Sequence, residues 1–238
     1  MPYILFQLTS VASPLDELRR ERKKAEINYW NKNLWKWRYY VWILRKIRKF
    51  RKKPNEADDR VCRELELMCE PFNKPITVVD LCCGDGSSLT KKLLKNKKMN
   101  IIGVDISKEC AKSSPAFRAN GFDCVAADCE YSPIKNDAVD VAIIRNSLHH
   151  LMDLRGLVKE VGRILRAGSV FLIIEVETKS PISNFVYHRI LAEPNYPFVT
   201  QEEIVPYLKE EGFALNNVAS LKVDTRRSFF VSATKVKD

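Results

Sequence analysis

The sequence predicts an α/β protein with a doubly wound, mostly parallel sheet of seven strands, a C-terminal antiparallel hairpin and a basic N-terminal helical extension. From residue 76 onward, short apolar runs alternate with helical stretches. Such alternation is typical of a mostly parallel sheet covered by helices on both faces. The two last apolar runs follow each other directly, which favours a hairpin. The first part of the chain instead has the spacing of one long helix.

The N-terminal helix is expected from Ser13 to about Lys53, with Ser13 as its N-cap and Pro14 at its first position. Apolar residues recur there at spacings of three and four, which places them on one face: Ile27, Trp30, Leu34, Trp37, Val41 and Leu44. A second helix is expected over residues 56–69. We therefore divide the chain into a basic, aromatic-rich extension over residues 1–55 and a domain over residues 56–238.

The remaining elements follow in alternation. The expected strands are Ile76–Leu81, Asn100–Asp105, Cys124–Ala127, Val139–Ile144, Ser169–Glu175, Ala214–Leu221 and Ser228–Thr234. The expected helices between them are Gly86–Lys97, Lys108–Asn120, Leu154–Leu165 and Gln201–Glu211. Thr200 is the expected N-cap of the last helix and Gly212 its end. The sheet that results would bind a ligand at the carboxyl ends of its strands.

Positive charge is concentrated at the N-terminus. The chain has 238 residues and a formal net charge of +10. Residues 1–60 contain 16 Lys and Arg against 7 Asp and Glu, whereas residues 61–238 contain 24 against 23. This asymmetry predicts an arm that meets nucleic acid or an anionic membrane surface. A solvated basic helix is the alternative.

The cysteines and the apolar segments indicate in which cellular compartment the protein is expected. The seven cysteines are odd in number and form no Cys-x-x-Cys pair, which favours reduced thiols and no metal site. No window has the roughly 18 uncharged apolar residues that a spanning helix needs. The short apolar start lacks the features of a signal peptide. We therefore expect a cytoplasmic protein, free or peripheral to a membrane, with no integral membrane segment.

A glycine loop follows the first strand. That strand ends near Asp80, and Gly84-Asp85-Gly86 precedes the next helix. Glycines let the backbone turn sharply, and N–H groups at a helix start favour a carboxylate or phosphate. A dinucleotide site would show a third glycine, but Leu89 stands there. Acids also end the next two strands, at Asp105 and Asp128, and a carboxylate can accept two hydrogen bonds from ribose hydroxyls.

These residues resemble the motifs of class I S-adenosylmethionine-dependent methyltransferases, which have a Rossmann-like fold. Residues 80–86 resemble the first motif, with Asp-x-x-x-Gly-x-Gly. Residues 137–151, which include Leu148-His149-His150-Leu151, resemble the fourth motif of the small-molecule and quinone-type branch, methyltransferase type 11. Residues 160–168 resemble the turn before the fifth strand, with Ala167 in place of the usual proline. The resemblance covers roughly residues 60–238.

The resemblance implies S-adenosyl-L-methionine as the cofactor. Asp80 would organise its amino group through water, Asp105 would bind the ribose and Asp128 the adenine amino group. The full set of implied cofactor contacts is Asp80, Cys82, Gly84, Asp85, Gly86, Asp105, Ile106, Asp128, Cys129, Arg145 and Asn146.

His149 and His150 are the candidate catalytic residues because they follow the fourth strand, near the expected methyl group. Either can act as a general base if the acceptor is protonated, since histidine titrates near neutrality. The alternative is that one ring is packed and the other lines the pocket.

The implied activity is methyl transfer to an oxygen, nitrogen or carbon nucleophile of a small or lipid-like acceptor. No Asn-Pro-Pro-Tyr type of sequence follows the fourth strand, which argues against amino-methylating enzymes of DNA, RNA and glutamine. Two alternatives stay open: an RNA (tRNA) or protein methyltransferase that docks through the basic helix, and a non-catalytic S-adenosylmethionine-binding module. Residues 19–53 could contact an anionic membrane, contact RNA or pack on the domain as a lid.

Overall fold

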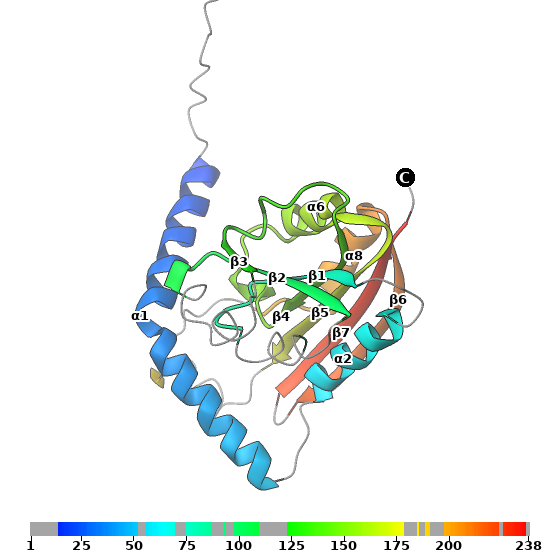
Figure 1. Ribbon diagram of the computed structural model, residues 1–238. Coiled ribbons are helices and arrows are strands. Elements are labelled where there is room, and N and C mark those ends of the chain that lie inside the picture. Colours follow the sequence, from blue (N-terminus) through cyan, green and yellow to red (C-terminus); the bar gives the residue numbers. More distant parts are fainter. Residues whose placement is uncertain are drawn as a thin grey trace, which may run out of the picture.

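A computed structural model describes residues 14–51, 56–69, 75–86, 93, 98–109, 123–178, 185, 189–190, 198–223 and 226–236 (Figure 1). Its centre is one sheet of seven strands: β1 (Ile76–Leu81), β2 (Met99–Asp105), β3 (Asp123–Ala126), β4 (Val139–Arg145), β5 (Leu165–Thr178), β6 (Phe213–Val223) and β7 (Arg226–Lys235). The strand order is β3-β2-β1-β4-β5-β7-β6. The predicted α/β fold class is confirmed.

The order in which the chain adds the parallel strands reverses at β1. The chain adds β2 and then β3 on one side of β1, and it returns to place β4 and then β5 on the other side. Such a reversal brings the carboxyl ends of neighbouring strands to one edge with a crevice between them. The last two strands are antiparallel, because β7 pairs with β5 and β6 with β7. The predicted hairpin is therefore confirmed.

The fifth strand is longer than expected. It begins at Leu165, directly after helix α6 (Leu154–Ile164), whereas the sequence predicts a turn at Arg166–Gly168 and a strand from Ser169. Val139 pairs with Leu165, and the register then shifts before Val141 pairs with Val170. The predicted turn is thus an irregularity inside the strand, where Gly168 adopts φ 80°.

Two apolar clusters lie on opposite faces of the sheet. On one face α6 and α8 (Gln201–Glu210) cover the strands, and their buried residues are Leu157, Val158, Val161, Ile164, Ile204 and Leu208. On the other face α2 (Glu56–Cys69) contributes Val61 and Leu65, and Leu93 packs there as well. Leu93 falls in the expected helix Gly86–Lys97. Most of that helix and of the expected helix Lys108–Asn120 lies outside the described residues.

Helix α1 (Pro14–Arg51) runs along one side of the domain (Figure 1). Its observed bounds agree with the expected helix from Ser13 to about Lys53. Ile27, Trp30, Leu34 and Trp37 are partly buried, which confirms that this spacing forms an inner face. The side chains of Val41 and Leu44 lie outside the described part of the chain. The domain boundary at residue 55 stays a prediction.

The two leucines of α2 provide a test of the core. Leu65 is fully buried, whereas Leu67, two residues further along, is 63% exposed. We expect Leu65→Ala to lower the free energy of unfolding by about 2–5 kcal/mol, because it removes buried methyl groups and leaves a cavity. Leu67→Ala should change it by less than about 0.5 kcal/mol. Urea unfolding followed by circular dichroism measures both; equal effects would contradict the packing of α2 on the sheet.

Candidate active site

The loop after β1 turns through three residues with positive φ. Cys82, Gly84 and Gly86 have φ of 53°, 57° and 60°. A Cβ atom built on Gly84 would meet nothing within 4 Å, so the backbone conformation, and not crowding within the protein, requires glycine there. Cys82 takes this conformation as an L-residue, and its Sγ lies 3.2 Å from the Sγ of Cys129. The sequence predicted the glycines but not the conformation of Cys82.

The carboxylate of Asp105 fixes this loop against the end of β2. Its Oδ2 accepts a hydrogen bond from the Gly84 amide at 2.8 Å, and its Oδ1 accepts one from the Ser107 amide at 2.9 Å. Burial raises the pKa of Asp105, although the two amide hydrogen bonds oppose the shift. A carboxylate has about four acceptor positions, and these bonds use two. The arrangement therefore fits the predicted ribose contact.

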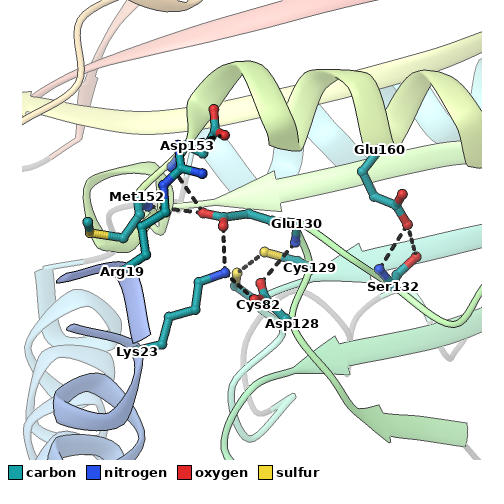
Figure 2. A network of polar contacts seen from close by, with 10 residues as sticks. All are labelled: Arg19, Lys23, Cys82, Asp128, Cys129, Glu130, Ser132, Met152, Asp153 and Glu160. Atoms are coloured by element: carbon teal, nitrogen blue, oxygen red, sulfur yellow. Dashed lines mark hydrogen bonds and ion pairs between the residues drawn. The ribbon is translucent and has the colours of Figure 1, made fainter. Parts of the chain in front are cut away.

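A lysine from α1 reaches the acids after β3. Lys23 forms ion pairs with Asp128 and with Glu130, the latter at 2.6 Å (Figure 2). Burial opposes the charge of Lys23, but the hydrogen bonds to both acids outweigh it and raise its pKa. The other oxygen of Glu130 accepts from the amides of Met152 and Asp153, at 3.0 and 3.2 Å. Glu130 thus joins α1, the end of β3 and the loop before α6.

Further contacts of α1 follow the same edge of the sheet. Arg19 pairs with Asp153 at 3.1 Å. The Ser107 hydroxyl donates to Asn31 at 2.7 Å, and Arg38 pairs with Asp85 at 3.1 Å. Together with Lys23, these residues reach the segments that follow β1, β2, β3 and β4. We call these four residues of α1, together with Glu26 and Trp30, which contact His150, the α1 cover. A lid over the site, one of the three roles open for this helix, stays a prediction.

The first candidate histidine forms a buried pair with an acid from β5. His149 Nδ1 lies 2.9 Å from Glu175 Oε1. Glu175 is fully buried, and it also accepts from the amides of Leu148 at 2.6 Å and of Val176 at 2.9 Å. An acid buried in an apolar strand is stable only when such hydrogen bonds compensate its lost hydration. The carboxylate therefore holds both the imidazole and the loop that carries it.

The second candidate histidine faces α1. His150 Nδ1 lies 3.4 Å from Glu26 Oε1, and the His150 ring meets Trp30 edge to face at 5.6 Å. The centroids of the two imidazole rings are 4.2 Å apart. The structure thus brings both predicted catalytic residues together and sets each beside a carboxylate. One carboxylate comes from the sheet and the other from the α1 cover.

The other predicted cofactor residues lie around the same switch point. Asp80 is buried at 5% exposure within β1. Ile106 directly follows Asp105, Arg145 ends β4, which pairs with β1, and Asn146 directly follows Arg145. Asn146 has φ 52°, and its amide donates to the Ile174 carbonyl at 2.7 Å. The structure therefore gathers the predicted set at one edge of the sheet, while the individual roles stay predictions.

Three acids of the site were not predicted from the sequence. Glu175 could have been found from the sequence, because it is the one charged residue in the otherwise apolar run from Val170 to Val176. Glu130 lies two residues after the predicted Asp128, which is a weaker signal. Nothing in the sequence distinguishes Glu26 from the other charged residues of α1. Which of them face the site depends on how the helix packs on the domain.

Within the described part of the chain, no group of three or more His, Cys, Asp or Glu side chains could hold a metal ion. Among the described residues, no disulfide is formed by Cys62, Cys82, Cys83, Cys124 or Cys129. Among the described helices, none combines the length and apolar character that a bilayer crossing requires.

Known proteins resemble this chain in sequence. The family model described as "Methyltransferase domain" matches residues 79–173. The O-methyltransferase cnsE of Penicillium expansum is 26% identical over 74% of this chain and 66% of its own length. The O-methyltransferase resE of Aspergillus sclerotiorum is 22% identical over 63% of this chain and 59% of its own length. The chain thus spans less than two thirds of either relative.

Solved structures share the fold. Geranyl diphosphate C-methyltransferase from Streptomyces coelicolor A3(2) superposes with a TM-score of 0.55 at 14% identity, over 74% of this chain and 79% of its own. The cyclase SpnF superposes with a TM-score of 0.59 at 15% identity, over 74% and 82%. At these identities the likeness establishes the fold, and a cyclase among the neighbours shows that the fold alone does not define the reaction.

Residues 79–173 therefore match a methyltransferase domain, in line with the resemblance of the sequence motifs to class I S-adenosylmethionine-dependent methyltransferases. S-adenosylmethionine is the cofactor that this resemblance implies.

The raised pKa of Asp105 predicts a pH-dependent cofactor affinity. The carboxylate is the form that accepts hydroxyl hydrogen bonds, so affinity should fall as the pH drops through this pKa. Since the pKa is raised, the loss should begin above the pH at which an ordinary aspartate, with a pKa of about 3.9, would lose its charge. Calorimetric titration with S-adenosylmethionine over a pH series measures this.

Matched variants identify the group. Asp105→Asn should weaken S-adenosylmethionine binding by at least about tenfold, because hydrogen bonds to a charged acceptor are lost. It should also remove this pH dependence. Asp137→Asn is the control, because Asp137 is an exposed aspartate that pairs with Lys235. Unchanged affinity in Asp105→Asn would show that the ribose assignment is wrong.

Proposed function

We propose that this protein transfers a methyl group from S-adenosylmethionine to a hydroxyl of a small or lipid-like acceptor, with His149 as the general base. The single observation that supports this most is the buried pair of His149 Nδ1 and Glu175 Oε1 at 2.9 Å. The sequence left oxygen, nitrogen and carbon acceptors open. A positioned base favours an acceptor that must lose a proton, and a hydroxyl is the commonest such group.

Methyl transfer places few demands on the protein. S-adenosylmethionine supplies an electrophilic methyl carbon on a sulfonium centre. The protein has to align the acceptor with that carbon and keep water away. A hydroxyl also needs an acceptor for its proton as it attacks, because it is a weak nucleophile at its own pKa.

Glu175 positions the base. Its carboxylate accepts a hydrogen bond from Nδ1–H of His149, which leaves Nε2 as the basic nitrogen of the neutral ring. When Nε2 takes the proton, the negative charge of Glu175 stabilises the imidazolium. The amides of Leu148 and Val176 hold Glu175 itself in place. The pair is thus oriented from the core of the sheet.

The rest of the site supports cofactor binding and exclusion of water. We assign the methionine part of the cofactor to the loop with Gly84 and Gly86, the ribose to Asp105 and the adenine amino group to Asp128. Since Lys23 pairs with Asp128, the α1 cover lies directly against the proposed adenine end. Closure of this helix over the strand ends would keep water from the reacting groups.

The relatives favour a small acceptor. Two curated relatives are named O-methyltransferases, and a structural neighbour is a C-methyltransferase of geranyl diphosphate, a prenyl compound. These names support a small or lipid-like acceptor for this chain.

Labelled methyl transfer tests the proposed activity. The protein is incubated with S-adenosylmethionine labelled in its methyl group and with fractionated cell extract. Label in the lipid or small-molecule fraction is the expected result. Label in RNA or protein would replace the proposed acceptor class. Cofactor binding by calorimetry without transfer to any fraction would indicate a non-catalytic module.

The His149–Glu175 pair predicts a kinetic signature. His149→Gln should lower kcat by about 10²–10⁴-fold, the usual contribution of a general base. Glu175→Gln keeps the shape but removes the charge, so it should lower kcat by a smaller factor and distort the acid limb of the pH–rate profile. Binding of S-adenosylmethionine should be unchanged in both. A wild-type kcat in His149→Gln would contradict the assignment.

The second histidine serves as the comparison. His150→Gln and Glu26→Gln alter the other His–Glu pair, which involves α1 and a longer 3.4 Å contact. We expect each to change kcat by less than about tenfold while the acceptor KM rises, because this pair lines the site without taking the proton. A loss in kcat equal to that of His149→Gln would transfer the role of base to His150.

A further inference from the structure

Helix α1 has a second face that the proposed chemistry does not use. Trp35, Tyr39 and Trp42 are 65%, 61% and 53% exposed. Their spacing of four and three places them on one side of the helix. Tyr29 is 9% exposed on the inner side, where Trp37 Nε1 donates to its hydroxyl at 2.7 Å. We call Trp35, Tyr39 and Trp42 the outer aromatic face.

The outer aromatic face is an ordered arrangement of rings and ammonium groups. The Tyr39 and Trp42 rings stack with centroids 5.9 Å apart and an interplanar angle of 18°. Lys46 Nζ lies 5.4 Å from the Trp42 ring, and Lys36 Nζ lies 5.9 Å from the Trp35 ring. Exposed aromatic rings in a contiguous group commonly mark a binding surface.

The charge of this segment limits the kind of partner. Residues 27–51 contain eight Lys and Arg and no Asp or Glu. On the described outer side, Lys32 and Lys46 are exposed. A partner of this face must therefore tolerate both apolar rings and a high density of positive charge, which means that it is anionic and partly apolar.

We propose that the outer aromatic face docks on the anionic surface of a lipid bilayer. Trp and Tyr rings favour the level of the lipid headgroups, where their apolar part is shielded and their polar atoms stay hydrated. Lysines beside them extend to the headgroup phosphates. This contact goes beyond methyl transfer and does not depend on it.

The arrangement of the rings favours a bilayer over RNA. Single-stranded RNA binds where aromatic rings offer open faces to bases along a basic groove. Here Tyr39 and Trp42 stack on each other, and lysines lie over the Trp35 and Trp42 rings. The rings are exposed, and they belong to a single helix that runs along one side of the domain (Figure 1). Such a protruding row suits a flat surface.

Docking in this way would place the strand ends near the bilayer. The inner side of α1 contacts Ser107, Asp128 and His150 through Asn31, Lys23 and Glu26. One helix would thus touch lipid with its outer side and cover the active site with its inner side. An acceptor dissolved in the bilayer would then have a short path to the site.

Vesicle sedimentation with the full chain tests the proposal. The probes are vesicles of phosphatidylcholine alone and of phosphatidylcholine mixed with phosphatidylserine. Binding to the mixed vesicles only, weakening as salt is added, is the expected result. Trp35→Ala/Tyr39→Ala/Trp42→Ala should lower the partition coefficient at least about tenfold, because ring burial is lost. Leu67→Ala, an exposed apolar change on α2, should leave it unchanged.

A charge variant keeps the test decisive if the triple variant misfolds. Lys32→Glu/Lys46→Glu should weaken binding about fivefold or more for each lysine changed. Circular dichroism and calorimetry with S-adenosylmethionine confirm that each variant is folded. Three results would overturn the proposal: no binding to the mixed vesicles, wild-type binding by both variants, or tighter binding of tRNA than of mixed vesicles at equal salt. None of these readouts involves methyl transfer, so failure of the proposed activity is seen separately.

Discussion

Buried carboxylates in or near the ends of the parallel strands accept hydrogen bonds from the backbone amides around them. Asp105 binds the amides of Gly84 and Ser107, Glu130 those of Met152 and Asp153, and Glu175 those of Leu148 and Val176. A buried carboxylate without such partners would be costly, and an amide without an acceptor likewise. Each acid therefore fixes two points of the surrounding backbone, and the site takes its shape from these pairs.

The same acids connect structure to chemistry because amide hydrogen bonds do not exhaust their acceptor capacity. Glu175 also holds His149, and Glu130 also holds Lys23 of the α1 cover. In our proposal the remaining capacity of Asp105 goes to the ribose. Each of these acids thus has two roles, because it anchors the backbone and serves the reaction. A substitution there affects both.

The sequence predicted the architecture well because strand and helix periodicity are local properties. It placed Asp105, Asp128 and both histidines at strand ends, where the parallel register gathers them. It did not predict the Glu175 and Glu26 contacts, because those depend on which strands become neighbours and on how α1 lies across them. The predicted start of β5 was wrong. Gly168 suggested a turn, whereas the pairing of Leu165 with Val139 extends the strand.

Helix α1 is held mainly by ion pairs and polar contacts, through Arg19, Lys23 and Arg38. Among the described residues of α1, Tyr29 is the only apolar side chain that is buried. Segments with few buried apolar contacts open at a lower free energy than the core to which they attach. We therefore expect the helix to open separately from the sheet. Amide hydrogens of α1 would exchange with solvent while the strands stay protected, so a ligand could enter and leave without unfolding the domain.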